Sequence, residues 1–299
     1  MSKLTKVLIT GASGLLGANL VRHYAGRADC SGFYGKNPIS ISGADLKHLE
    51  LTDRQSVSRA IKQLRPDLII HCAAATNVEW CEKHPDLAKT INEDVAIFLA
   101  ELSSETGAKF VFMSTDSVFD GNSGNYLESD TPGPLNSYAT GKVRAEEAVN
   151  RLNPDTLVIR SYFYGHSPSG TRSLLEWVLV RAMAGNVVPG FTDSYFSPIG
   201  VHDFADALDS AIMANISGIL HLGSSNAISK HEFARMVMET YGCEMSLLRP
   251  ITVDDAGLSA NRPRNTSLNV AMLESIWGRV APSVADGINR LSSQANPFA

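Results

Sequence analysis

The sequence predicts an α/β protein of the Rossmann type, in which a doubly wound parallel sheet is followed by a smaller C-terminal substrate-binding lobe. Short apolar runs alternate with helical patterns up to about residue 165, which is typical of a parallel sheet with crossover helices. A glycine-rich turn joins the first strand pattern to the first helix pattern. Small and polar residues follow several strand patterns, at the ends where open α/β sheets bind ligands.

Composition excludes several classes of function. Apolar residues make up 44% of the 299 residues and charged residues 19%, which is ordinary for a globular protein. The net charge of −5 argues against nucleic acid as a partner. No apolar run reaches the roughly 18 residues that a membrane span needs. The segment Met1 to Lys6 is polar, so no signal peptide is expected, and the four cysteines lack paired or metal-ligand spacing. We therefore expect a cytoplasmic protein.

The first strand pattern leads into a turn suited to a dinucleotide. The run Lys6 to Thr10 enters the sequence GASGLLG, and a helix is expected through about Ala25. Such glycines permit a tight turn, a close approach of the backbone to a pyrophosphate, and close packing of the helix on the strand. A plain strand–helix turn is the alternative. The candidate cofactor residues here are Gly11, Ser13, Gly14, Leu15 and Gly17.

The next two strand patterns bear on the choice of nicotinamide cofactor. An acidic residue after the second strand, near Cys30 to Tyr34, would bind the ribose of NAD, but this position contains Lys36. Lys36 suits a 2′-phosphate, which favours NADPH over NADH, although a solvated loop lysine explains it equally well. After the third strand pattern, Leu51 could cover an adenine and Glu50 or Asp53 could bind its amine. Asp53 is also a candidate cap for a helix over 54–64.

Small residues follow the strand pattern that ends at His71. Ala73, Ala74 and Ala75 leave room for a cofactor at this end of the sheet, and a helix over about 85–106 comes next. The sequence predicts a cofactor-binding domain over residues 1–165. Residues 166–299 are predicted to form the substrate lobe, with about 195–222 returning to the main sheet.

The stretch from Phe110 to Asn150 carries the candidate catalytic residues. A strand through Met113 is followed by Thr115, and a helix then begins near Tyr138 and contains Lys142 four residues later. Residues four apart lie on one helix face, so a phenol and an ammonium can point into one site. A nearby cation favours the phenolate, which makes Tyr138 a candidate general acid or base. Thr115 is positioned to offer a hydroxyl to the same substrate oxygen.

These motifs together resemble an extended short-chain dehydrogenase/reductase. The segments TGASGLLG, STDSVFDG and YATGK carry this resemblance, and AAATNVEWCEKHPDLAKTIN and RPRNTSL extend it toward the dTDP-4-dehydrorhamnose reductases. The likeness spans nearly the whole chain and is looser in the C-terminal lobe. Two departures lie near the expected sugar: Ser117 replaces a tyrosine, and the aromatic run 162–164 replaces a pattern that usually contains tryptophan.

The resemblance implies reduction of a 4-keto group on a nucleotide-linked 4-keto-6-deoxy sugar. In that role Tyr138 would protonate the developing alkoxide, Lys142 would tune the phenol and hold the nicotinamide ribose, and Thr115 would bind the carbonyl oxygen. Tyr138 and Lys142 would thus both belong to the cofactor-binding residues as well. Implied contacts to the substrate come from Asn77, Asp116, Ser117, Tyr162 and Arg262. Some members hold a metal at a dimer contact through glutamates, but Asn19 stands at one such position, so we predict no metal.

Two other functions stay open at the level of sequence. An epimerase on the same fold would use the same tyrosine and lysine, whereas a dehydratase needs an acid–base pair that Asp116 and Ser117 do not provide. The regulatory subunit of some methionine adenosyltransferases also resembles this family and acts as a partner-binding module. A homodimer is a further expectation.

Overall fold

The computed structural model describes residues 6–298, which divide into two compact units. The expectation about a signal peptide rests mainly on residues 1–5, which lie outside this range. The first unit contains residues 6–114, Asn136–Ile159 and Ile216–Ile219, and the second contains Thr115–Leu135, Arg160–Asn215 and residues 220–298. The chain therefore passes between the units several times. The predicted domain boundary at residue 165 stays a prediction.

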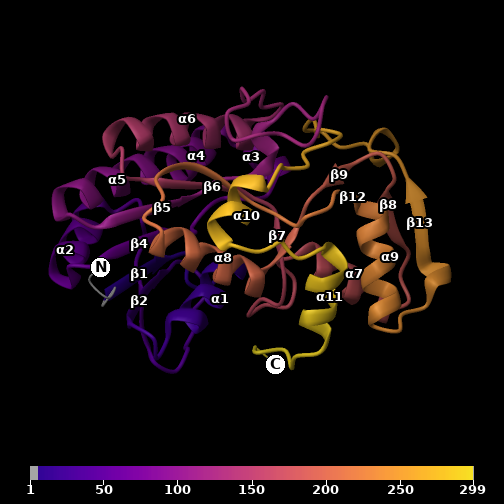
Figure 1. Ribbon diagram of the computed structural model, residues 1–299, viewed down its shortest axis with the longest axis horizontal. Coiled ribbons are helices and arrows are strands. Elements are labelled where there is room, and N and C mark those ends of the chain that lie inside the picture. The colour runs from indigo at the N-terminus through magenta and orange to yellow at the C-terminus, as the bar shows by residue number, and fades with distance from the viewer. Residues whose placement is uncertain (1–5, 299) are drawn as a thin grey trace. The chain divides into compact units, whose positions relative to one another are not determined.

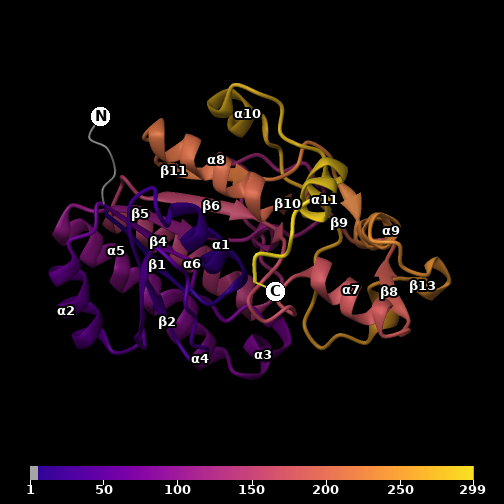
Figure 2. The same cartoon turned by 90° about the horizontal axis from the view of Figure 1, so that it is seen from below.

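A seven-stranded sheet forms the centre of the fold and confirms the predicted Rossmann-type class. Its order is β11-β6-β5-β4-β1-β2-β3, and the pairings from β6 through β3 are parallel. Figures 1 and 2 show strands β1, β2, β4 and β5 side by side. The strands are β1 (Lys6–Thr10), β2 (Asp29–Tyr34), β3 (Ala44–His48), β4 (Leu68–His71), β5 (Lys109–Met113), β6 (Leu157–Ser161) and β11 (Gly218–Leu222).

Four longer helices accompany this sheet in the first unit. They are α1 (Leu15–Tyr24), α2 (Arg54–Leu64), α5 (Val95–Thr106) and α6 (Ser137–Leu152). Apolar side chains of α2, α5 and α6 pack with the strands into one buried cluster, which includes Ile61, Leu99 and Val149. Two of these helices begin at a side-chain cap, because Asp53 accepts a hydrogen bond from the Ser56 amide and Asn136 accepts one from the Ala139 amide.

The helix predicted over 85–106 is interrupted. After α3 (Val78–Lys83), the chain forms α4 (Pro85–Lys89), a π-helical turn η1 (Thr90–Asp94), and then α5. The turn contains Asn92, whose buried amide hydrogen-bonds the backbone of Ala75 beyond β4. A π-helical turn inserts one residue into the helical register, and such turns are frequent at functional sites.

The second unit combines helices with three two-stranded sheets. Figure 2 shows β8 (Val188–Phe191) and β13 (Leu248–Ile251) paired beside α7 (Leu174–Met183) and α9 (Lys230–Thr240). The remaining elements are β7 (Phe163–Tyr164), β9 (Tyr195–Phe196), β10 (Ile199–Gly200), β12 (Ile228–Ser229), η2 (Asp116–Val118), η3 (Met245–Leu247), η4 (Asp254–Ala256), α8 (Val201–Met213), α10 (Ala271–Trp277) and α11 (Val284–Ser292). Within residues 6–298, none of the helices is long and apolar enough to cross a membrane.

Candidate functional site

Gly11 in the turn between β1 and α1, and Gly17 in α1, have no room for a side chain. A Cβ on Gly17 would lie 2.1 Å from the carbonyl oxygen of Gly11, and Gly11 itself has φ +69°. A Cβ on Gly11 would lie 2.7 Å from the backbone nitrogen of Ala73, beyond β4. The first turn of α1 carries no acidic residue, and its cap, Gly14, has no side chain to occupy the helix N-terminus. This N-terminus can therefore receive an anion.

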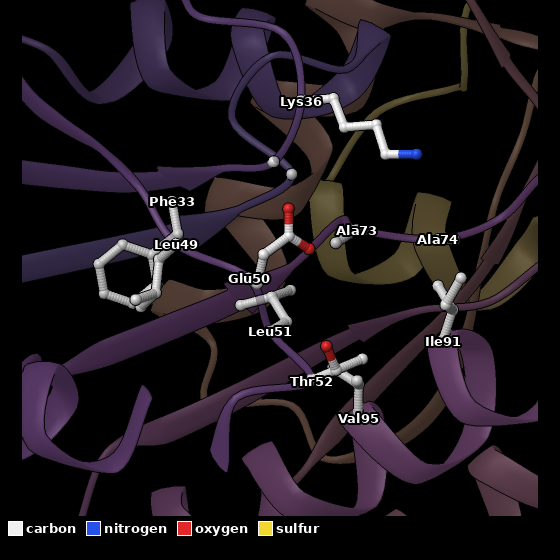
Figure 3. Close-up of a pocket in the computed structure, with 12 residues that line it drawn as sticks. Phe33, Lys36, Leu49, Glu50, Leu51, Thr52, Ala73, Ala74, Ile91 and Val95 are labelled. Atoms are coloured by element: carbon white, nitrogen blue, oxygen red, sulfur yellow. The ribbon is translucent and has the colours of Figure 1, made fainter. Parts of the chain in front are cut away.

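A cavity of about 290 Å³ opens beside this turn in the first unit. Figure 3 shows Lys36 and Glu50 projecting toward it, with Leu51, Thr52 and Val95 along another side. The full lining is Gly11, Phe33, Gly35, Lys36, Leu49, Glu50, Leu51, Thr52, Ala73, Ala74, Ile91 and Val95. Six residues that the sequence singled out for cofactor binding thus share one cavity. Asp53 is outside this lining and caps α2 instead.

The backbone after β4 is held by a side chain that the sequence did not single out. The Asn92 Oδ1 accepts from the Ala75 amide at 2.8 Å, and its Nδ2 donates to the Ala75 carbonyl at 3.0 Å. The Cys81 thiol donates to the same carbonyl at 3.3 Å. These contacts fix the segment that places Ala73 and Ala74 in the cavity. Asparagine inside a helix gives no such indication, because its distant partner depends on the π-helical turn.

Tyr138 and Lys142 lie one turn apart near the beginning of α6. Lys142 is buried, its Nζ donates to the Met113 carbonyl at the end of β5 at 2.8 Å, and it lies 4.7 Å from the centre of the Phe112 ring. Burial lowers the pKa of Lys142 to about 8, although the Glu146 carboxylate acts in the opposite direction. Glu146 also accepts a short hydrogen bond from the Ser114 hydroxyl. The first unit therefore holds a buried amine one helical turn from a phenol.

A buried histidine lies close enough to this amine for the charge of Lys142 to affect its pKa. Burial, together with the positive charge of Lys142, lowers the pKa of His71 to about 3. The His71 Nδ1 is 2.7 Å from the Thr10 hydroxyl, and its ring stacks beside Phe110 and Phe112. His71 is therefore neutral at physiological pH, and it links the end of β4 to the end of β1 through its contact with Thr10.

In the second unit, a buried carboxylate collects three hydroxyl groups. The Asp116 Oδ1 accepts from Thr115 at 3.1 Å and from Ser117 at 3.2 Å, while its Oδ2 accepts from Thr266 at 2.6 Å. Burial raises the pKa of Asp116, and the Thr266 hydroxyl and the charge of Lys230 oppose that rise. The Thr115 hydroxyl also accepts from the Ser117 amide at 3.2 Å. Asp116 therefore orients the Thr115 hydroxyl.

Lys230 connects this carboxylate to further aromatic and cationic side chains of the second unit. Tyr162 packs edge-on against Phe196, with ring centres 4.8 Å apart. The Lys230 ammonium lies 5.9 Å from the centre of the Phe196 ring and senses the charges of both Asp116 and Arg262. The structure thus brings Asp116, Tyr162 and Arg262 to one neighbourhood, together with Lys230, which the sequence presented only as the first residue of a helix.

The other candidates have simpler surroundings. Asn77 is exposed in the first unit and caps α3 by accepting from the Trp80 amide at 2.9 Å. Asn19 lies in α1 and donates from its side chain to the Leu15 carbonyl. No group of three or more potential metal-ligating side chains occurs within residues 6–298.

Comparison with known proteins gives a match along nearly the whole chain. The model of the family described as "RmlD substrate binding domain" matches residues 5–296. A probable low-salt glycan biosynthesis reductase of Haloferax volcanii is 31% identical over 296 residues, covering 97% of this chain and 98% of the relative.

Two further matches concern function. The methionine adenosyltransferase 2 subunit beta of Bos taurus is 31% identical over 281 residues, covering 91% of this chain and 82% of the relative. Among solved structures, the dTDP-4-dehydrorhamnose reductase of Bacillus anthracis in complex with NADP has a TM-score of 0.85. It is 26% identical and covers 98% of this chain and 100% of that one.

Proposed function

The chain belongs to the family described as RmlD substrate binding domain, and on this basis we propose that it reduces the 4-keto group of a nucleotide-linked 4-keto-6-deoxy sugar with NADPH. The observation that carries the proposal is the pair Tyr138 and Lys142 on α6, in a unit that also has a glycine turn and an adjoining cavity. The similar Bacillus anthracis protein is a dTDP-4-dehydrorhamnose reductase in complex with NADP.

The residues of the first unit fit a dinucleotide. The N-terminus of α1 is capped by Gly14 without a side chain, which leaves its amides available to a pyrophosphate. Leu51 offers an apolar surface to an adenine, and Lys36 offers a cation to a 2′-phosphate. Lys36 is the reason for proposing NADPH, with NADH as the alternative. When bound, the cofactor supplies a hydride to the carbonyl carbon of the substrate.

Side chains of the protein donate the proton and stabilise the charge that develops during the reduction. Tyr138 gives its phenolic proton to the oxygen that becomes an alkoxide, and Lys142 stabilises the phenolate that remains. Lys142 also binds the nicotinamide ribose. Thr115 donates a hydrogen bond to the carbonyl oxygen, which requires its hydroxyl to turn away from Asp116. Asn77, Asp116, Ser117, Tyr162 and Arg262 stay proposed substrate residues, with Asn77 the weakest candidate because it caps α3.

The decisive experiment measures oxidation of NADPH with a dTDP-4-keto-6-deoxy sugar made in place by a dehydratase. We expect turnover in the wild type and a loss of about 100- to 10,000-fold in Tyr138→Phe, because the variant lacks the transferable proton. Titration with NADPH should give similar affinity in both proteins. Full activity in Tyr138→Phe would reject the proposal, and a product epimerised without net oxidation of NADPH would favour the epimerase.

A partner-binding regulatory subunit is the second candidate, because a bovine relative at 31% identity is a beta subunit of methionine adenosyltransferase 2. A panel of nucleotide-linked keto sugars separates the two functions. Absence of turnover across the panel, together with a stable complex with a methionine adenosyltransferase catalytic subunit in size-exclusion chromatography, would support the regulatory role.

We also propose a cytoplasmic homodimer. Light scattering coupled to size-exclusion chromatography tests the oligomeric state, and cell fractionation tests the compartment.

A further inference from the structure

We propose that Lys230 binds the diphosphate of the substrate together with Arg262, in an anion subsite of the second unit. This inference rests on the proposed function for the nature of the substrate. It adds a binding residue that no motif of the sequence indicates. Lys230 is the only lysine after Lys142 in the chain.

The backbone around Lys230 is fixed on both sides. Lys230 is the first residue of α9, and the Ser229 hydroxyl caps this helix by accepting from the Glu232 amide at 3.0 Å. The Lys230 amide donates to the Ser194 carbonyl at 2.9 Å, and Ser229 pairs with Tyr195 across β12 and β9. The backbone contacts therefore fix the position from which the Lys230 side chain starts.

The ammonium group of Lys230 lies among aromatic rings without a direct polar partner. It is 5.9 Å from the ring centres of both Phe191 and Phe196, and these aromatic faces favour a cation. Across residues 6–298, however, the structure gives this ammonium no hydrogen bond and no close ion pair. Three N–H donors are thus available to a ligand.

The surrounding charges make this an unfavourable place for a cation alone. Lys230 lies at a helix N-terminus, where the helix dipole disfavours positive charge. Burial lowers the pKa of Lys230, and the charge of Arg262 lowers it further, while Asp116 acts in the opposite direction. The Asp116 carboxylate already accepts hydrogen bonds from Thr115, Ser117 and Thr266. An anion bound between the two cations removes their mutual repulsion.

A diphosphate suits this arrangement better than a single carboxylate. It carries more than one negative charge, and the subsite offers two cations of different geometry. A lysine acts as a compact point charge, whereas an arginine presents a planar fork to phosphate oxygens. The Arg262 Nη1 already donates to the Ala260 carbonyl at 3.2 Å, which orients the guanidinium near its own loop. Tyr162 and Phe196 complete the neighbourhood with apolar surface.

Calorimetric titration of the full-length protein tests the subsite without turnover. The probes are dTDP, UDP and GDP, each compared with its nucleoside, in wild type, Lys230→Met and Lys230→Arg. We expect Lys230→Met to weaken binding of the preferred nucleoside diphosphate by about 10- to 100-fold, because a hydrogen bond to a charged group is lost. Lys230→Arg should retain most of the affinity. Binding of the nucleoside and of NADPH should be unchanged.

A matched control removes the same charge elsewhere in the unit. Arg249 in β13 is exposed, so Arg249→Met should leave binding of the diphosphate unchanged. Equal affinity of Lys230→Met and wild type would overturn the subsite and leave the proposed reduction standing. A wild type that binds none of the three diphosphates and reduces no nucleotide-linked keto sugar would overturn both.

Discussion

Buried ionisable side chains show most directly how this protein prepares a site for charge. The Lys142 ammonium donates to the Met113 carbonyl at the end of β5 and lies over the Phe112 ring. Burial lowers its pKa to about 8. An amine in this state loses little further solvation when a ligand covers it. His71 is kept neutral by burial and by the charge of Lys142, so of this pair only the lysine carries positive charge.

The burial of His71 predicts a pH dependence of stability. Its pKa is about 3 in the folded protein, against 6.5 in the unfolded chain. Between these values the unfolded state binds a proton that the native state does not, so stability is present above pH 6.5 and is lost as the pH falls. Each such histidine contributes a slope of up to about 1.4 kcal/mol per pH unit.

Urea unfolding of wild type and His71→Gln between pH 7 and pH 5 measures this slope. We expect a smaller decrease of the unfolding free energy toward pH 5 in the variant. His221, whose pKa is likewise lowered to about 3 by burial, provides the comparison, and His221→Gln should reduce the slope similarly. An unchanged slope in His71→Gln would show that this histidine titrates normally.

Site residues that belong to a local sequence motif could be predicted. Site residues that come together only through contacts between distant segments could not. The spacing of Tyr138 and Lys142 follows from helix periodicity, and the glycines follow from the strand–turn–helix order. Thr266 hydrogen-bonds Asp116 and the charge of Lys230 acts on it, both from segments more than a hundred residues away, and neither residue has a local pattern that indicates it. Such contacts arise from tertiary packing alone.

At the scale of elements, two helical glycines offer a matched test of the cofactor turn. A Cβ on Gly17 in α1 would meet the Gly11 carbonyl oxygen at 2.1 Å, whereas a Cβ on Gly141 in α6 would meet nothing closer than 3.9 Å. Gly17→Ala should cost about 1–3 kcal/mol or more, because backbone must move. Gly141→Ala should stabilise the helix by about 0.5–1 kcal/mol.

Thermal unfolding and NADPH titration of the two variants check this prediction. We expect Gly17→Ala to lose both melting temperature and NADPH affinity, since the displaced turn is the proposed pyrophosphate site. Gly141→Ala should keep NADPH affinity. Equal behaviour of the two variants would mean that the turn tolerates a methyl group and that its glycine is not required by packing.

The elements with strong local patterns were well predicted. The helix over 54–64 agrees with α2 residue for residue, because Asp53 caps it and its apolar positions repeat every three to four residues. The two-residue strands of the second unit are too short to show alternation, so only their pairing defines them. The π-helical turn at Thr90–Asp94 shifts the register by one residue, which periodicity over a long window does not resolve.

At the scale of the whole molecule, the chain builds each unit from separated segments. The first unit takes Ile216–Ile219 from far along the sequence, and the second takes Thr115–Leu135 from between two strands of the first. Within the second unit, the Asp116 carboxylate accepts from Thr266, and Tyr126 pairs with Leu268. Alternation of strands and helices predicted the sheet, but local sequence does not show that the segment Thr115–Leu135 joins the second unit.

This exchange of segments predicts that residues 1–165 do not fold alone. The fragment lacks β11, whose Gly218 amide donates to the Thr156 carbonyl, and it lacks Ile216, whose carbonyl accepts from the Lys109 ammonium. The β6 edge of the sheet would then be left unpaired, which favours aggregation. The segment 115–135 would also lose its partners in the C-terminal part of the chain.

We expect the fragment 1–165 to be insoluble or to unfold without cooperativity in urea. Coexpression with residues 166–299 should restore a soluble complex that binds NADPH. A soluble fragment with a cooperative transition would instead make residue 165 a true domain boundary, since the first 165 residues would then contain every contact that their fold requires.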